Sequence, residues 1–248
     1  MTTLESDANA ATAEQDAAAA GRKVWDLPVR LFHWALVASF VGAFVTNRLG
    51  VSYFKYHVWC GYSVIVLVSF RLIWGVVGTH HAKFKNFLKG PAAIAAYMRD
   101  LARGRDARYA GHNPLGALMV VTLLATLGVQ AVAGLFANDE IFNAGPFAAL
   151  VSKEGSLRLT GLHKTLFYWI AAAVALHVGA VLLHVFVKDE NLVRAMITGK
   201  KPGHAVRHSD VIYSSRVLLA VAIVCAVSVA FAAALDAAPV GDLDAAGF

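Results

Sequence analysis

The feature that most constrains this chain is an apolar run in its second half that is long enough to cross a lipid bilayer. Residues 165–187 contain no Asp, Glu, Lys or Arg, and about 20 apolar residues in a helix span the hydrocarbon core. The composition agrees, with 58% hydrophobic and only 15% charged residues, where a soluble domain has about 25%. We therefore predict an all-α integral membrane protein.

Five segments of the sequence have the length and hydrophobicity of a membrane span. They are residues 27–47, 56–77, 114–137, 162–187 and 217–235. Asp26 is the predicted N-cap of the first span, with Pro28 in its first turn. Residues 1–21 are acidic and rich in Ala, which predicts a disordered tail. We expect a four-helix domain over residues 22–198, then a basic linker and a fifth transmembrane helix over residues 199–248.

The distribution of Lys and Arg predicts the orientation in the membrane. Sixteen of these residues lie before the first span, in its first turn, or after the second and fourth spans, and five lie at the opposite ends of the spans. The positive-inside rule then places the N-terminus in the cytoplasm and the C-terminus outside. The net charge of +6 reflects these basic loops at the lipid surface, so we expect no nucleic-acid partner.

Four histidines lie within these spans near the predicted membrane faces. His163 and His177 are fourteen residues apart, which places them on nearly the same helix face about 21 Å apart. The topology sets His57 and His163, the outer pair, near the outer face, and His33 and His177, the inner pair, near the cytoplasmic face. Spacing alone also allows His184 to replace His177. The other histidines are expected to be solvated in loops: His80, His81, His112, His204 and His208.

Histidine inside a membrane is rare and costly, so these positions are candidate functional sites. Two imidazoles can hold one haem iron from opposite faces, an arrangement that suits electron transfer. Zinc fits less well, because it prefers four ligands and no Asp or Glu lies within a predicted span. The chain has no Cys-x-x-Cys-His motif, which excludes covalent c-type haem. A redox-silent membrane scaffold, with interhelical hydrogen bonds from each His, is the remaining alternative.

The histidine motifs resemble the bacterial cytochrome b561 family, which includes the b-type subunits of membrane nickel–iron hydrogenases. The matching segments are VWDLPVRLFHW around His33, YHVWCGYSVIVLVSFRLIW around His57, and LHKTLFYWIAAAVALHVGAVLLHVFVKDENLVRAM around His163 and His177. The resemblance implies a four-helix transmembrane haem bundle with two non-covalent b haems, ligated by His33, His57, His163 and His177. It favours His177 over His184. The fifth span goes beyond this basic pattern and favours a subunit that has a partner.

The resemblance also implies a function. Such a protein carries electrons across the bacterial inner membrane, between a periplasmic partner such as a c-type cytochrome or a hydrogenase-like protein and the quinone pool. Arg30 and Arg71 are expected to pair with haem propionates or to anchor helix ends, and His184 is a candidate for a quinone site. The alternative is an enzyme, a stand-alone superoxide:quinone oxidoreductase. Whether the chain forms a homo-oligomer stays open.

Overall fold

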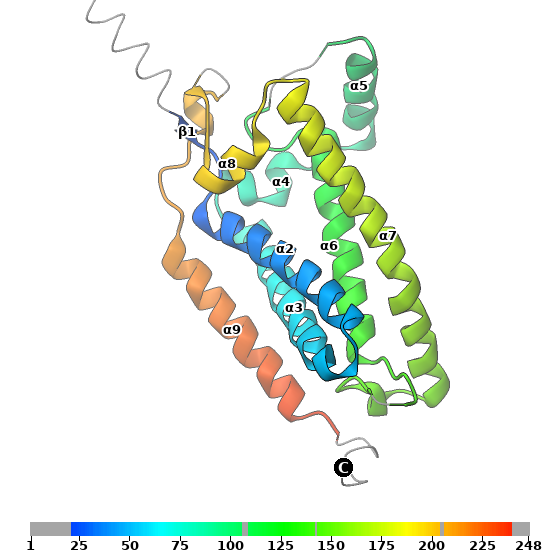
Figure 1. The fold of residues 1–248 in the computed structure, drawn as a ribbon. Coiled ribbons are helices and arrows are strands. Elements are labelled where there is room, and N and C mark those ends of the chain that lie inside the picture. Colours follow the sequence, from blue (N-terminus) through cyan, green and yellow to red (C-terminus); the bar gives the residue numbers. More distant parts are fainter. Residues whose placement is uncertain (1–20, 106–108, 142, 204–205, 240–248) are drawn as a thin grey trace, which may run out of the picture. The chain divides into compact units, whose positions relative to one another are not determined.

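The computed structural model describes residues 21–105, 109–141, 143–203 and 206–239, which are mostly helical (Figure 1). Five helices are long and apolar enough to cross a membrane: α2 (Leu27–Arg48), α3 (Phe54–Val77), α6 (Pro114–Leu135), α7 (Lys153–Phe186) and α9 (Val217–Asp236). They confirm the five predicted spans. The predicted tail, apart from Gly21, lies outside the described residues.

The shorter elements lie between these helices. They are strands β1 (Arg22–Lys23) and β2 (Lys200–Lys201), helices α4 (Phe84–Phe87), α5 (Pro91–Ala102) and α8 (Leu192–Thr198), and the 3-10 turns η1 (Val51–Tyr53), η2 (His80–Ala82), η3 (Ala148–Leu150) and η5 (His208–Asp210).

Helix α7 begins nine residues before the predicted start of its span. Ser152 begins the helix, with its hydroxyl accepting a hydrogen bond from the backbone N–H of Gly155 and its carbonyl accepting one from Ser156. Glu154 and Arg158 then form an exposed ion pair one turn apart. These polar turns are helical but too polar for lipid, so a hydrophobicity criterion cannot detect them.

The chain divides into two compact units, which we describe separately. Unit 1 comprises Met1–Arg30, Trp74–Leu118 and Val181–Val217, and unit 2 comprises Leu31–Ile73, Met119–Ala180 and Leu218–Phe248. The predicted division at residues 21 and 198 follows the order of the spans and stays a prediction.

Unit 2 is a bundle in which α2, α3, α6 and α7 form a closed ring. Four contacts define the order of the helices, one for each neighbouring pair: Gly42 with Cys60, Val68 with Gly128, Gly134 with His163, and Phe44 with Phe167. The fifth helix, α9, contacts α3 through Phe231 and Tyr62, whose rings are 5.4 Å apart. The predicted architecture, a four-helix bundle with one additional helix, is confirmed.

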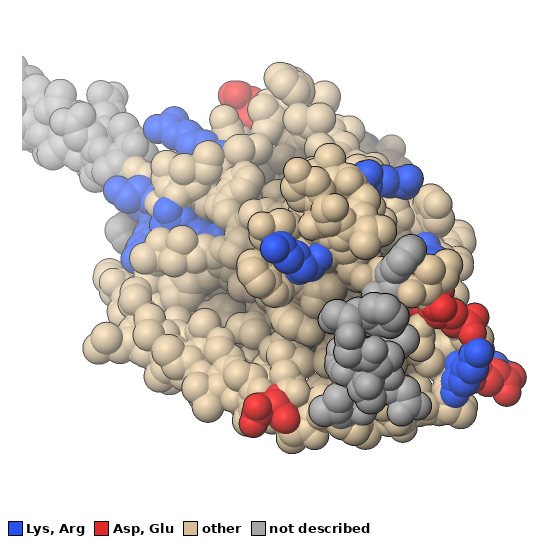
Figure 2. Space-filling view, turned by 60° about the horizontal axis from the view of Figure 1, so that its bottom comes forward, with Lys and Arg blue, Asp and Glu red and all other residues tan. Residues whose placement is uncertain are grey.

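The surface of the long helices is apolar. Leu176 and Trp169 of α7 are more than half exposed, as is Leu218 of α9. On the face shown in Figure 2, side chains of Lys, Arg, Asp and Glu occupy small patches, several of them near the edges, and most of the described surface is formed by other residues. A surface of this kind is suited to lipid rather than water, which agrees with a multi-pass membrane protein.

Unit 1 holds the segment that precedes α2 in place through backbone pairing. Strands β1 and β2 are antiparallel, with Arg22 opposite Lys201. The backbone N–H groups of Val24 and Trp25 both donate to the carbonyl of Gly199. Gly199 ends α8 with a φ of 81°, and a Cβ there would lie 2.7 Å from the carbonyl oxygen of Trp25. Only glycine therefore fits this close crossing.

The predicted cap of the first span is confirmed. The carboxylate of Asp26 is buried and accepts a 2.7 Å hydrogen bond from the backbone N–H of Val29. It also accepts hydrogen bonds from Trp74 Nε1 and the hydroxyl of Thr79. The cap therefore also joins α2 to the end of α3 within unit 1.

The expectation that all loop histidines are solvated is wrong for His81. Its side chain is only 8% exposed, and a ring nitrogen lies 2.6 Å from the carbonyl oxygen of Asp210. The ring of His112 packs at 4.8 Å from both Trp25 and Phe87. Aromatic packing within unit 1 overrides the polar character of these loop positions. His204 and the side chain of His208 lie outside the described residues.

Candidate functional site

The outer pair lies inside the bundle of unit 2, between α3 and α7. The ring centroids of His57 and His163 are 6.1 Å apart, and the ring planes are inclined at 79°. His57 Nδ1 donates to the carbonyl of Ala43 on α2, and His163 Nδ1 donates to that of Gln130 on α6, both at 2.8 Å. These bonds select the tautomer and leave Nε2 of each ring for another ligand.

The inner pair lies between α2 and α7 of the same unit. The ring centroids of His33 and His177 are 6.5 Å apart, with the planes inclined at 60°. His33 Nδ1 is buried without a hydrogen-bond partner among the described residues. The structure therefore brings His33 to His177, the pairing that the family resemblance favours.

The separation of the rings in each pair fits one metal ion between them. A metal–imidazole bond is about 2 Å long and the ring centre lies about 1.2 Å beyond the nitrogen, so two rings on one metal have centroids about 6.4 Å apart. The two observed distances, 6.1 and 6.5 Å, lie close to this value. Within the described ranges, no group of three or more His, Cys, Asp or Glu side chains could hold a metal ion. Each site thus offers two imidazoles, the set that a haem iron takes and a zinc ion rarely does.

The guanidinium of Arg71 lies deep in the bundle. Arg71 is only 3% exposed. It follows His57 by fourteen residues on α3, and the same spacing separates His163 from His177 on α7. The neighbouring Phe70 contacts Phe32, which precedes His33, with ring centroids 6.4 Å apart. Arg71 is therefore at the level of the inner pair. Arginine at this depth is rare and costly in a membrane, which makes Arg71 a candidate functional residue.

Arg30 lies in unit 1 and precedes His33 by three residues on α2. Its Nη2 donates a hydrogen bond to the carbonyl of Ile197, and its Nε is buried without a hydrogen-bond partner among the described residues. Pairing with a haem propionate remains a prediction for both arginines.

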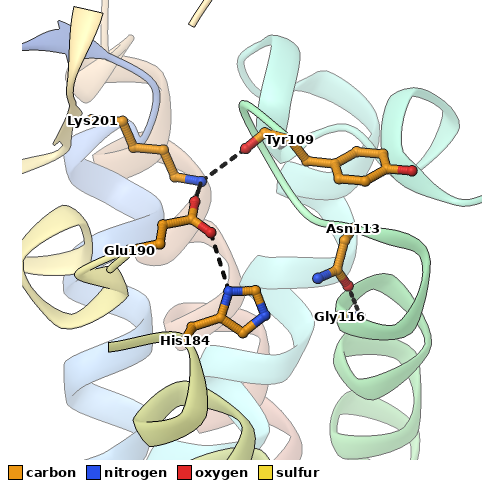
Figure 3. Close-up of polar contacts among 6 residues, drawn as sticks. All are labelled: Tyr109, Asn113, Gly116, His184, Glu190 and Lys201. Carbon is orange, nitrogen blue, oxygen red and sulfur yellow. Dashed lines mark hydrogen bonds and ion pairs between the residues drawn. The ribbon is translucent and has the colours of Figure 1, made fainter. Parts of the chain in front are cut away.

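His184 takes part in a different network, which lies in unit 1 (Figure 3). Its Nδ1 is 3.1 Å from one carboxylate oxygen of Glu190. The other oxygen accepts a 2.7 Å hydrogen bond from Lys201 Nζ, which also donates to the carbonyl of Tyr109 at 2.9 Å. Burial acts to raise the pKa of Glu190, but the hydrogen bonds and charges of Lys201 and His184 outweigh it and lower that pKa below its usual value.

The lowered pKa of Glu190 predicts how stability depends on pH. A carboxyl whose pKa is lower in the folded state stabilises the protein above its unfolded pKa of about 4.5 and loses this effect as pH falls through the folded value. We expect Glu190→Gln to cost about 2 kcal/mol at pH 7, because the Lys201 ammonium, 4% exposed, then lacks its counter-ion. Thermal unfolding in detergent should show a lower melting temperature for the variant at pH 7 and a smaller difference near pH 4. An equal difference at both pH values would contradict the prediction.

Two positions that support the outer pair were not predicted. Ala43 and Gln130 act through backbone carbonyls, which every residue has, so side-chain patterns do not reveal them. Gln130 lies within the transmembrane helix α6. Its side-chain oxygen is buried and has no hydrogen-bond partner among the described residues. A polar residue at such a position is the one signal that the sequence offered here.

Comparison with known proteins bears on what these sites hold. A family model described as prokaryotic cytochrome b561 matches residues 24–199, which include all four paired histidines. A probable Ni/Fe-hydrogenase B-type cytochrome subunit from Cupriavidus necator is 23% identical over 235 residues, covering 77% of this chain and 93% of the relative. A protein of the same name from Azotobacter chroococcum mcd 1 is 25% identical over 210 residues, covering 71% and 86%. No solved structure matches the chain.

The family match covers well over half of the chain, and the two relatives are matched over most of their own length. The chain therefore belongs to the prokaryotic cytochrome b561 family, whose members are membrane b-type cytochromes that transfer electrons through haem b.

Proposed function

We propose that the chain holds two b haems, one between the outer pair and one between the inner pair, and carries electrons across the bilayer between a periplasmic protein and membrane quinone. The observation that supports this best is the ring separation of 6.1 Å in one pair and 6.5 Å in the other, within one bundle. A bound haem supplies an iron that takes up and releases one electron. Two imidazoles on one iron would leave no open position for oxygen, which favours electron transfer.

The chain's own contribution to this reaction is ligation, orientation and charge. Each proposed site uses histidines from two different helices, so helix packing sets the ring separation. The carbonyls of Ala43 and Gln130 orient the outer rings. Arg71, and Arg30 three residues from His33, are the proposed partners of the propionates of the inner haem, because guanidinium groups bind carboxylates with two parallel hydrogen bonds.

The proposed electron partner is a periplasmic hydrogenase-like subunit or a c-type cytochrome. Support comes from the relatives, both of which are named as probable hydrogenase cytochrome subunits. The segment between α6 and α7, which leads into the helix that carries His163, offers the proposed docking surface. In this segment Ile141 is 69% exposed and Leu150 is 60% exposed. The excess of Lys and Arg at the opposite end supports a cytoplasmic N-terminus and a periplasmic C-terminus.

We propose His184 as the proton-carrying group of the quinone site. His184 follows His177 by seven residues on α7, about 10.5 Å along the helix axis. Reduction of a quinone to a quinol takes up two electrons and two protons. With Nδ1 held by Glu190, the imidazole presents Nε2 as the nitrogen that can face a quinone oxygen.

His184→Ala tests the quinone site. We expect the purified variant to keep both haems and to transfer electrons from reduced haem to a soluble ubiquinone analogue on the order of a hundredfold more slowly. Stopped-flow absorbance of the haem bands measures this rate. His80→Ala, an exposed histidine of a 3-10 turn in unit 1, is the matched control and should retain the wild-type rate.

Two results would contradict this part of the proposal. An unchanged rate and unchanged quinone affinity in His184→Ala would exclude His184 from the site. Oxidation of superoxide by the purified chain alone, coupled to quinone reduction, would instead support the stand-alone superoxide:quinone oxidoreductase.

A further inference from the structure

We infer that Glu190 and Lys201 are positioning residues for His184: Glu190 holds the imidazole with a hydrogen on Nδ1, and Lys201 holds Glu190. The inference rests on the proposed function, because it concerns the side chain proposed to carry protons to the quinone. It assigns different tasks to the three side chains, since only His184 would touch the quinone and the other two act through it. All three residues belong to unit 1.

The turn that follows α7 brings Glu190 back to His184 through two contacts. The backbone N–H of Glu190 donates to the carbonyl of His184 at 3.0 Å, and a carboxylate oxygen of Glu190 lies 3.1 Å from His184 Nδ1. Asp189, which precedes Glu190, has a φ of 51°, a left-handed conformation that is uncommon outside glycine and least costly for Asn and Asp. This turn directs the side chain of Glu190 at the ring.

The charge of Glu190 determines which ring nitrogen carries the hydrogen. Burial acts to raise the pKa of Glu190, but Lys201 and His184 lower it below its usual value, so the carboxylate is ionised at pH 7. An ionised carboxylate can only accept hydrogen bonds, so Nδ1 of His184 must be the donor. Nε2 lies on the side of the ring that faces away from Glu190 (Figure 3). It is therefore the nitrogen left for a quinone oxygen.

Lys201 fixes the carboxylate in this role. Its Nζ is 2.7 Å from the second carboxylate oxygen of Glu190, it also donates to the carbonyl of Tyr109 at 2.9 Å, and the residue is only 4% exposed. The pairing of β2 with β1 holds the backbone of Lys201 opposite Arg22. To turn away from His184, the carboxylate would have to break a buried ion pair, which is costly.

Lys201 also keeps Glu190 in the form that selects the tautomer. Lys201 on β2 and His184 on α7 are the titratable side chains that contact Glu190 in the described part of the chain. If Lys201 loses its charge, burial is opposed by His184 alone, and the pKa of Glu190 rises. A protonated Glu190 can donate a hydrogen bond to Nδ1, which would select the opposite tautomer.

The arrangement supports the transfer of one proton at a time. Protonated His184 has a hydrogen on both nitrogens. Its Nε2–H bond breaks as an O–H bond forms on a quinone oxygen, and the quinone takes one electron from reduced haem. The ring is left neutral with its hydrogen on Nδ1, and a proton from water restores it, since the side chain of His184 is 15% exposed. Two such cycles supply the two protons and two electrons of one quinol.

Nitrogen NMR of the purified protein with isotope-labelled histidine measures the tautomer directly. The signals of His184 are those that disappear in His184→Ala. We expect the neutral ring of the wild type to carry its hydrogen on Nδ1. In Glu190→Gln the ammonium of Lys201 binds the amide oxygen, so the amide nitrogen faces the ring and the hydrogen should move to Nε2. A hydrogen on Nε2 in the wild type would overturn the inference, whether or not Glu190→Gln folds.

Electron transfer from reduced haem to a soluble ubiquinone analogue measures the consequence for the reaction. We expect Glu190→Gln to keep both haems and to lower the maximum rate about ten- to a hundredfold, with little change in KM. Asp100→Asn, which alters an exposed carboxylate of α5 in unit 1, is the matched control and should retain the wild-type rate. A wild-type rate in Glu190→Gln would overturn the role of Glu190.

The pH dependence of the same rate tests Lys201. Lys201→Met removes the charge, so the rate relative to the wild type should decrease as pH falls, because Glu190 then takes up a proton. Lys201→Arg keeps the charge and should retain most of the wild-type rate at every pH. A loss in Lys201→Met that is the same at every pH would overturn the role of Lys201.

A double variant separates positioning from a general effect on the fold. If Glu190 acts only through His184, the variant that combines His184→Ala with Glu190→Gln should be as slow as His184→Ala alone. A further tenfold loss would overturn the inference. Failure of the proposed function gives a different result: an unchanged rate in His184→Ala excludes His184 from the quinone reaction, whereas the tautomer measurement still decides whether Glu190 positions the ring.

Discussion

Replacing His57 or His163 by alanine is expected to remove one of two b haems, so that the ratio of haem to protein falls from near two to near one. The physical reason is that each ring would supply one of the two proposed ligands of the outer haem, and its partner ring, 6.1 Å away between centroids, cannot replace it. His33→Ala and His177→Ala should remove the inner haem in the same way. Pyridine haemochrome analysis against protein concentration measures the ratio.

His184→Ala is the matched control for these variants, because it removes an imidazole from the same helix without changing either pair. It should keep a ratio near two. If His184→Ala loses a haem while His177→Ala keeps both, the inner ligand is His184 and the proposed pairing is wrong. A ratio near zero or one in the wild-type protein would refute the model of two sites.

Most of the membrane architecture could be predicted because the bilayer imposes a simple rule on the sequence. A span must be apolar over about 20 residues, and the five predicted spans agree with the helices to within two residues, except at the start of α7. That exception is physical, since the polar turns from Lys153 onward are helical outside the apolar region. Hydrophobicity locates the part of a helix that lies in the bilayer, but it does not detect polar helical turns that extend beyond the bilayer.

The histidine pairing was predictable in part, from helix periodicity and topology. Fourteen residues bring His163 and His177 to one face, and alternating spans bring His57 to the level of His163. The sequence could not separate His177 from His184 without the family resemblance, because seven residues also return to the same face. In the structure, the rings of His33 and His177 lie together, whereas His184 contacts Glu190.

The contacts of unit 1 could not be predicted, because they depend on pairing between distant short segments. Two strands of two residues each carry no periodic signal, and Lys201 is 179 positions from its partner Arg22. Glu190 and Lys201 look like ordinary loop charges in the sequence. Only the folded backbone brings them to His184, so the network in Figure 3 is a result of tertiary structure.

Asp26→Ala is expected to cause the largest loss of stability outside the haem sites. The carboxylate is 1% exposed and accepts hydrogen bonds from the backbone of Val29, the indole of Trp74 and the hydroxyl of Thr79. Loss of an N-cap costs about 1 kcal/mol, and each buried donor that loses its acceptor costs about 1–3 kcal/mol. The sum, about 3–7 kcal/mol, corresponds to a decrease in melting temperature on the order of 10 °C or more for a chain of this size.

Thermal unfolding of the purified protein in detergent, followed by circular dichroism, measures this decrease. Asp26→Asn is the matched control: its amide oxygen can still cap α2 and accept one further hydrogen bond, so we expect it to lose less than half as much. The ratio of haem to protein in Asp26→Ala should stay near that of the wild type when it is measured below the melting temperature, because Asp26 belongs to unit 1 and both histidine pairs belong to unit 2. A melting temperature within 2 °C of the wild type would show that the buried contacts of Asp26 do not hold the start of α2 in place.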